Sequence, residues 1–161
     1  MNILCFAGAH ASSVFDFHET LSVANKLASL TRMPRRLDVA FVGVRRRTTV
    51  YPGVTLATEP LARPADLVLI PGIEHARGAP VTLRLPLLRA ETRYVRQCVQ
   101  RGIWVGAVCG GTFLLAEAAR EPRRIATSWW LEREFAARFP HHTLEPHVLA
   151  VSKRIITAGA V

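Results

Sequence analysis

Short runs of apolar residues alternate along the chain with longer segments in which apolar residues recur every three or four positions. The apolar runs predict buried β-strands, and the longer spacing predicts amphipathic helices. Strands are expected at 2–7, 36–44, 66–72 and 103–108, with strand-like segments at 123–128 and 149–160. Helices are expected at 14–30, 85–102, 111–119 and 129–139, and the Pro-Gly pair within 49–58 predicts a turn or an edge ribbon.

The order of these segments predicts the fold class. Near-continuous apolar strands separated by helices are typical of an α/β protein with a doubly wound, mostly parallel sheet and helices on both faces. Functional residues of such sheets collect at the carboxyl ends of the strands. The loops after Ala7 and Ile70, and the turn at Cys109, are therefore expected to meet at one edge.

The length and composition of the chain favour a single domain. The chain has 161 residues, and half of them are hydrophobic, which is enough for one proper core. No apolar run reaches the roughly 18–20 residues that a bilayer-crossing helix needs. The start, "MNILCFAGAH", has neither a basic leader nor a helical apolar segment, and is interpreted as a first strand rather than a signal peptide. We therefore expect one cytoplasmic domain, 1–161, without a membrane segment.

The net charge of +9 raises the question of nucleic-acid binding. Arginine supplies nearly all of this charge, in small clusters without interleaved aromatic residues, zinc-finger spacing or a basic heptad pattern. A solvated basic surface is therefore the favoured interpretation, and direct binding of DNA by this chain is not expected.

The stretch "GAVCGGTFLL", Gly106–Leu115, holds the strongest chemical signal. Cys109 follows a predicted strand, precedes a predicted helix and is flanked by small residues, as in a nucleophile elbow. The amide groups at the start of the helix favour a thiolate over a thiol, and the amide of Gly110 can stabilise a developing oxyanion. The alternative is a small buried side chain at a strand end, which remains open on the pattern alone. Cys5 and Cys98 are interpreted as packing residues.

These segments together resemble the ThiJ/PfpI family of the class I glutamine amidotransferase-like superfamily. The resemblance runs nearly end to end and rests on "LVLIPG", "VCGGTFLLAEA", "RRIATSWWLEREFAARFP" and "ITAGA". Within the superfamily, these motifs most resemble the amino-terminal sensing domain of AraC-type transcriptional regulators. The resemblance implies a flavodoxin-like fold.

The resemblance also implies roles for particular residues. Asp16, in "SVFDFHE", matches the acidic residue that family members place against the nucleophilic thiol. Gly72 and Ile73 match the oxyanion loop, where many members carry a second glycine in place of Ile73. Independently of the resemblance, Trp129 and its neighbour Trp130 are candidates for an aromatic pocket wall, with packing in the core or at an interface as the alternative.

One departure from the family pattern concerns the base partner of the cysteine. Hydrolytic members often carry a histidine where this chain has Ser128, and serine is no general base near neutral pH. Glutaminase or protease activity is therefore not expected. His75, in the loop after "LIPG", is the main candidate substitute, and His18 is a weaker one. The other histidines, His10 among them, are interpreted as loop or surface residues. No cofactor is expected and, since no cluster has metal-ligand spacing, no metal either.

A second departure lies at the carboxyl end. Relatives continue past "TAGA" into a helix that covers the sheet, whereas this sequence ends at Val161. We therefore expect a truncated domain, a homodimer, and contact with DNA only through an attached helix-turn-helix domain that this chain lacks.

Two functions remain open at this point. The first is a regulatory domain that senses a small-molecule ligand or the oxidation of Cys109. The alternative is a stand-alone cysteine-dependent hydratase or hydrolase, similar to isocyanide hydratases, with Cys109 as nucleophile and Asp16 as acid/base.

Overall fold

The computed structural model describes residues 1–31, 34, 36–75, 79–145 and 149–159. Its central sheet has seven strands in the order β10-β11-β7-β6-β1-β2-β5, and every neighbouring pair is parallel except β10 and β11. The sheet strands are β1 (Asn2–Leu4), β2 (Ala40–Gly43), β5 (Glu59–Pro60), β6 (Leu67–Ile70), β7 (Trp104–Val108), β10 (Leu149–Ser152) and β11 (Ile155–Ala158). The predicted mixed but mostly parallel α/β sheet is confirmed.

Two small pairs of strands lie outside the central sheet. The hairpin of β3 (Arg47–Tyr51) and β4 (Val54–Ala57) turns at Gly53, whose φ of +80° suits glycine, so the Pro-Gly signal correctly marked a ribbon. The other pair, β8 (Arg124–Ile125) and β9 (Thr143–Leu144), is parallel.

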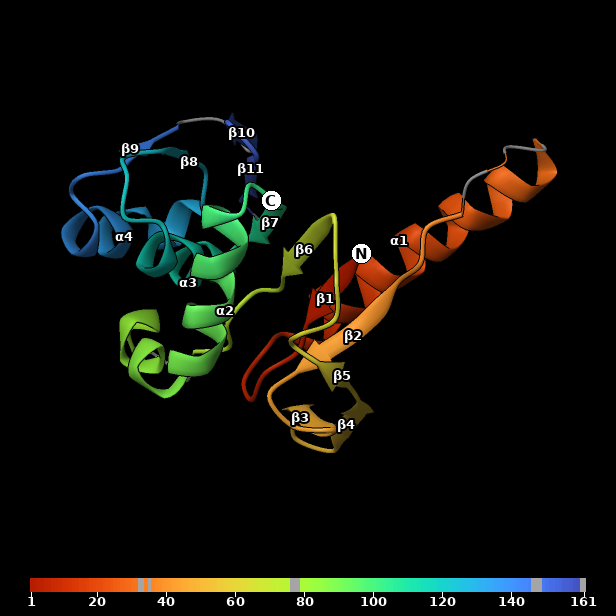
Figure 1. Ribbon diagram of the computed structural model, residues 1–161. Helices are drawn as coiled ribbons and strands as arrows, with labels where there is room; N and C mark the ends of the chain where they lie inside the picture. The colour runs from red at the N-terminus through yellow and green to blue at the C-terminus, as the bar shows by residue number, and fades with distance from the viewer. Residues whose placement is uncertain (32–33, 35, 76–78, 146–148, 160–161) are drawn as a thin grey trace.

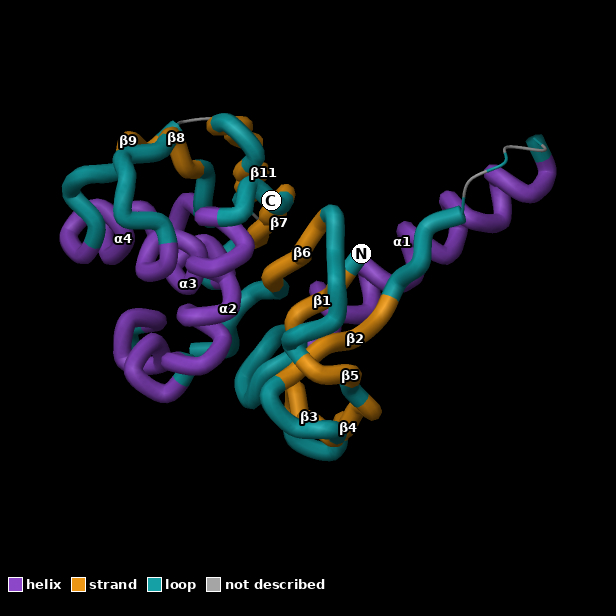
Figure 2. The backbone as a smooth tube through the Cα atoms, viewed as in Figure 1, coloured by secondary structure: helices purple, strands orange, loops and turns teal. Residues whose placement is uncertain are grey.

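Helices lie on both sides of the central sheet (Figure 1). Helix α1 (Ala11–Leu30) covers one face, whereas α2 (Arg89–Gln100) and α3 (Gly111–Ala118) cover the other, with α4 (Glu132–Arg138) packed beyond α3. Short 3₁₀ helices, η1 (Val81–Leu87) and η2 (Trp129–Leu131), precede α2 and α4 (Figure 2). Among the described helices, none combines the length and the apolar character that crossing a bilayer requires.

Two elements differ from the sequence-based expectation. The single helix expected at 85–102 is divided at Leu88, whose φ of −106° and ψ of 33° are not helical, so that η1 ends at Leu87 and α2 begins at Arg89. The strand-like segment 149–160 forms two antiparallel strands, joined by a turn in which Lys153 has a φ of +57°. Ala160 lies outside the described residues.

The two faces of β6 show how the core is divided. Val68 and Ile70 are fully buried beneath α3, whereas Leu67 and Leu69 point to the face of α1 and are only half-buried. On the buried side, Phe113 of α3 makes edge-to-face contacts with Phe135 and Phe139 at centroid distances of 5.1 and 6.0 Å. A buried aromatic cluster therefore packs on α3, the helix that begins at the turn of Cys109.

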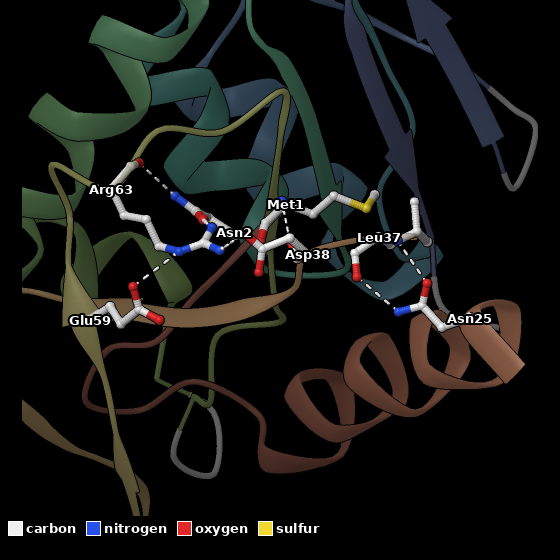
Figure 3. A network of polar contacts seen from close by, with 7 residues as sticks. All are labelled: Met1, Asn2, Asn25, Leu37, Asp38, Glu59 and Arg63. Atoms are coloured by element: carbon white, nitrogen blue, oxygen red, sulfur yellow. Dashed lines mark hydrogen bonds and ion pairs between the residues drawn. The ribbon is translucent and has the colours of Figure 1, made fainter. Parts of the chain in front are cut away.

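A polar network fastens the amino terminus to the segments beside the neighbouring strands β2 and β5 (Figure 3). The Arg63 guanidinium donates to Oδ1 of the buried Asn2 at 2.6 Å and pairs with the carboxylates of Asp38 and Glu59. The amino group of Met1 donates to the Asp38 carbonyl oxygen at 2.6 Å. One side chain thus joins the start of β1 to the segments that precede β2 and follow β5.

Candidate functional site

The turn between β7 and α3 holds Cys109 in an unusual backbone conformation. Its φ is +50°, in the left-handed region that residues other than glycine rarely adopt, so its backbone is strained. The Cys109 amide donates to the Ala158 carbonyl oxygen at 2.9 Å. The Cys109 carbonyl oxygen accepts from the hydroxyls of Thr112 and Thr127 at 2.7 and 3.2 Å. The surrounding chain therefore fixes this conformation from both sides.

The two glycines after Cys109 let the loop from β6 approach closely. A Cβ on Gly111 would lie 2.3 Å from the Pro71 carbonyl oxygen, and one on Gly110 would lie 3.1 Å from the backbone nitrogen of Ile73. The loop after β1 joins the same edge, since the His10 amide donates to the Gly72 carbonyl oxygen at 2.8 Å. The predicted meeting of three loops at one edge of the sheet is thus observed.

The backbone amides at this edge have unused hydrogen-bonding capacity. Neither the Gly110 amide nor the Ile73 amide donates a hydrogen bond to any described residue, although both residues are buried. The Ile73 backbone nitrogen lies close to Gly110, so two amides without an acceptor among the described residues stand beside Cys109.

A cavity of about 660 Å³ opens beside Cys109, between α1 and the sheet. Most of its wall is apolar, including Phe17, Leu21 and Leu69, whereas its polar groups come from the first turns of α1 and from Cys109. The full lining is His10, Ser12, Ser13, Asp16, Phe17, Thr20, Leu21, Leu67, Leu69, Val108, Cys109, Trp130 and Gly159. A mostly apolar cavity with a few convergent polar groups is typical of a small-molecule site.

Asp16 reaches this cavity from the first part of α1. Its spacing of three from Ser13 and four from Ser12 and Thr20 puts these residues on one face of the helix. The Asp16 side chain is largely exposed, and no hydrogen bond joins it to Cys109. The two residues therefore line the same cavity without a hydrogen bond between them.

His10 is a cavity residue that the sequence analysis interpreted as a loop or surface residue and did not place in the site. It directly precedes α1 and lies against Gly72, where a Cβ would stand 3.2 Å from its Nδ1. Burial, followed by the positive charge of His75, lowers the pKa of His10, while Glu74 acts in the opposite direction. His10 therefore favours the neutral imidazole. Its position just beyond β1, in a loop already expected at this edge, was the signal that could have identified it.

The other predicted pocket residues lie outside the cavity lining. Ser128 is fully buried behind the turn, at the start of η2. His75 is half-buried, with its Nδ1 3.4 Å from the Ile73 carbonyl oxygen. Trp129 is 73% exposed, and Trp130 lines the cavity in its place. His18 stacks on Phe41 with ring centroids 5.0 Å apart, away from the site.

The other two cysteines sit in different environments. Burial raises the pKa of Cys5 to about 12 and also raises the pKa of Cys98. Both thiols consequently resist deprotonation near neutral pH. Within the described residues, no group of three or more histidine, cysteine, aspartate or glutamate side chains could hold a metal ion.

Neither protein-family models nor curated protein sequences give a match to this chain. Several solved structures, however, match its fold. An AraC family transcriptional regulator from Pseudomonas putida is 13% identical, with a TM-score of 0.70 over 98% of this chain and 81% of the regulator.

DJ-1 from Schizosaccharomyces pombe is also 13% identical, with a TM-score of 0.60 over 99% of this chain and 82% of the other. A two-domain protein from Anabaena variabilis, with DJ-1/ThiJ/PfpI-like and ferritin-like domains, is 18% identical. Its TM-score is 0.63 over 98% of this chain and 42% of that protein. The fold of this chain is therefore the ThiJ/PfpI-like α/β fold that DJ-1 proteins and regulators of the AraC family share.

Proposed function

We propose that this chain is the sensing domain of a transcriptional regulator and that Cys109 lies in its ligand pocket. The observation that carries the proposal is the strained Cys109 turn on the wall of an apolar cavity of about 660 Å³. The likeness to the Pseudomonas putida regulator supports the regulatory role. A small molecule in this cavity would contact α1, the end of β7 and Trp130 at the same time, so that binding could alter how two copies of the chain pair.

Oxidation of Cys109 is the redox form of the same proposal. The thiolate sulfur attacks one oxygen of a peroxide and the O–O bond breaks. The leaving hydroxide takes up a proton, giving a sulfenic acid and water. The polar sulfenic acid would stand at the end of the cavity that holds His10 and Asp16.

The activated thiol predicts a rank order of reactivity. At pH 6, Cys109 should react with iodoacetamide about tenfold or more faster than Cys5 and Cys98, because burial raises the pKa of the other two. Peptide mass spectrometry after short labelling times measures each rate. Cys109→Ser should abolish the fast phase and leave the other two rates unchanged. Labelling of Cys109 at or below the rate of Cys5 would contradict an activated turn.

The sensing role predicts a structural response to oxidation. Hydrogen peroxide at about equimolar amounts should convert Cys109 to the sulfenic acid first and shift the monomer–dimer equilibrium. Sedimentation velocity measures this shift. Cys109→Ser should show no shift, and dithiothreitol should reverse it in the wild type. An unchanged sedimentation profile in protein whose Cys109 is shown to be oxidised would refute the redox form of the proposal.

The alternative is a cysteine-dependent hydratase or hydrolase. It is favoured by the free amides of Gly110 and Ile73 beside the Cys109 turn, with Asp16 and His10 available in the same cavity. In this case Cys109 is the nucleophile, Asp16 the acid/base, and the two amides hold the developing charge. Hydration of a small aliphatic isocyanide that is lost in Cys109→Ser would favour this alternative over the sensor.

A further inference from the structure

A second cavity, of about 390 Å³, lies on the opposite side of the sheet from Cys109. It is an open cavity lined by residues of η1, α2, α3 and the end of α4, which gather on that side of the molecule (Figure 1). Four arginines line it: Arg89, Arg93 and Arg96 from α2 and Arg138 from α4. The proposed sensing function does not use this cavity.

Arginine side chains outnumber the acidic ones in this lining by a wide margin. Glu117 supplies the single carboxylate among the lining residues, and it pairs with Arg138 at 2.9 Å. Beside the lining, the Glu134 carboxylate accepts from the Thr82 backbone amide at 2.8 Å. Among the described residues, the arginines of α2 therefore form no ion pair, and positive charge is left in excess.

The spacing of these arginines runs against the local preference of a helix. Arg89 and Arg93 are four residues apart and Arg93 and Arg96 three apart, so all three project from one face of α2. Like charges at this spacing destabilise a helix. An anion bound between the guanidinium groups would offset their repulsion, because each group is attracted to it. The spacing of the three arginines therefore suits an anion site.

Arg96 is partly buried, whereas the other three lining arginines are exposed. Its Nε–H is buried and has no hydrogen-bond partner within the described residues, while its terminal nitrogen donates to the Glu117 carbonyl oxygen at 3.2 Å. A buried donor without an acceptor is costly. Because the Nε–H is closed off from solvent, an oxyanion in the cavity would meet the terminal nitrogens of Arg96 rather than its Nε.

We infer that this cavity binds a small molecule through a phosphate group. A phosphate carries close to two negative charges and has several acceptor oxygens, and guanidinium groups bind it bidentately. The lining has four arginines and one glutamate, so a ligand with a single carboxylate would leave part of the positive charge without a partner. The volume of about 390 Å³ admits a small ligand rather than a folded partner.

Inorganic phosphate is the probe for this site. Thermal unfolding is measured in phosphate and in chloride of equal ionic strength, and titration calorimetry measures the dissociation constant. At phosphate concentrations of about ten times that constant, the unfolding temperature should rise by about 3–6 °C relative to chloride. Arg89→Gln and Arg93→Gln should each weaken binding about tenfold or more and abolish most of this rise.

The control is Arg46→Gln, which removes the same charge from an exposed residue outside the cavity. It should retain the phosphate-dependent rise. Phosphate also stabilises folded proteins in general, but that effect is the same in every variant. An equal rise in wild type, Arg89→Gln and Arg93→Gln, or an equal loss in Arg46→Gln, would overturn the inference. Acetate matching phosphate at the same concentration would overturn the assignment of the phosphate group.

In chloride alone, the two arginine substitutions should not lower the unfolding temperature. Because each substitution relieves repulsion on α2, Arg89→Gln and Arg93→Gln should unfold at the same temperature as the wild type or slightly higher. This control separates loss of a ligand from loss of the fold. A clear fall of the unfolding temperature in chloride would indicate that the arginines stabilise the fold itself and would count against a ligand site.

Discussion

Replacing Phe113 with alanine should lower the free energy of unfolding by about 3–5 kcal/mol, since the substitution leaves a cavity in a rigid part of the core. Phe113 is completely buried, and its ring packs edge-to-face against Phe135 and Phe139. Single domains of this kind are stable by about 5–15 kcal/mol, so the loss would be a large part of the total. Denaturant unfolding followed by circular dichroism measures it.

Phe15→Ala is the matched control for this substitution. Phe15 lies on α1 and is 43% exposed, so its loss should cost less than about 1 kcal/mol. A Phe113→Ala protein as stable as Phe15→Ala would show that α3 is not packed as described. Loss of the Phe113 contacts should also slow the labelling of Cys109, because α3 is the helix whose first amides face the turn.

Gly111→Ala is expected to be the second strongly destabilising substitution. Alanine normally stabilises a helix relative to glycine by about 1 kcal/mol, and Gly111 is the first residue of α3. Here the new Cβ would lie 2.3 Å from the Pro71 carbonyl oxygen and 2.9 Å from that of Ile70. Since backbone atoms cannot rotate aside, α3 must move away from β6, at a cost of about 1–3 kcal/mol in place of the usual gain.

The control for this prediction is Gly106→Ala in β7. Its nearest neighbour is the Cδ2 methyl of Leu69 at 2.7 Å, which can rotate away. Gly106→Ala should therefore cost less than Gly111→Ala in the same denaturant experiment. A Gly111→Ala protein as stable as the wild type, or more stable, would show that Gly111 does not lie against the loop after β6 as described. The hydrogen bonds that fix the Cys109 backbone would then also need revision.

The relation between Cys109 and the loop after β6 explains why both predictions concern the same region. The turn is strained, and strained turns persist only where the surroundings hold them. Gly110 and Gly111 bring Ile73 and Pro71 into contact with the turn, while Thr112 and Thr127 hold its carbonyl oxygen. Stability at α3 and the geometry at Cys109 should therefore change together.

The candidate site was only partly predictable. The position of Cys109 followed from an apolar run, two glycines and a helix-forming segment, which are local signals. Which side chains share the cavity with Cys109 is a matter of tertiary packing. Trp130 lines the cavity whereas Trp129 is exposed, and no spacing rule distinguishes two adjacent tryptophans at the start of a short helix.

The arginines of α2 are a second case in which the sequence alone did not show which side chains share a cavity. The sequence shows Arg89, Arg93 and Arg96 on one face of a helix, which by itself indicates a solvated basic surface. Arg138 is more than forty residues further along the chain, and only the packing of α4 beside α2 and α3 brings it to the same cavity. Charge that is dispersed in the sequence is thus concentrated in space.

By itself the sequence determined the class of fold, the approximate position of nearly every helix and strand, and the turn that carries Cys109. These follow from hydrophobic periodicity and from glycine and proline, whose effects act over a few residues. Only the tertiary structure decided that His10 belongs to the cavity, that Asp16 and Cys109 line it without a hydrogen bond between them, and that residues 149–158 turn back on themselves. Those outcomes depend on contacts between residues far apart in the chain, which periodicity does not encode.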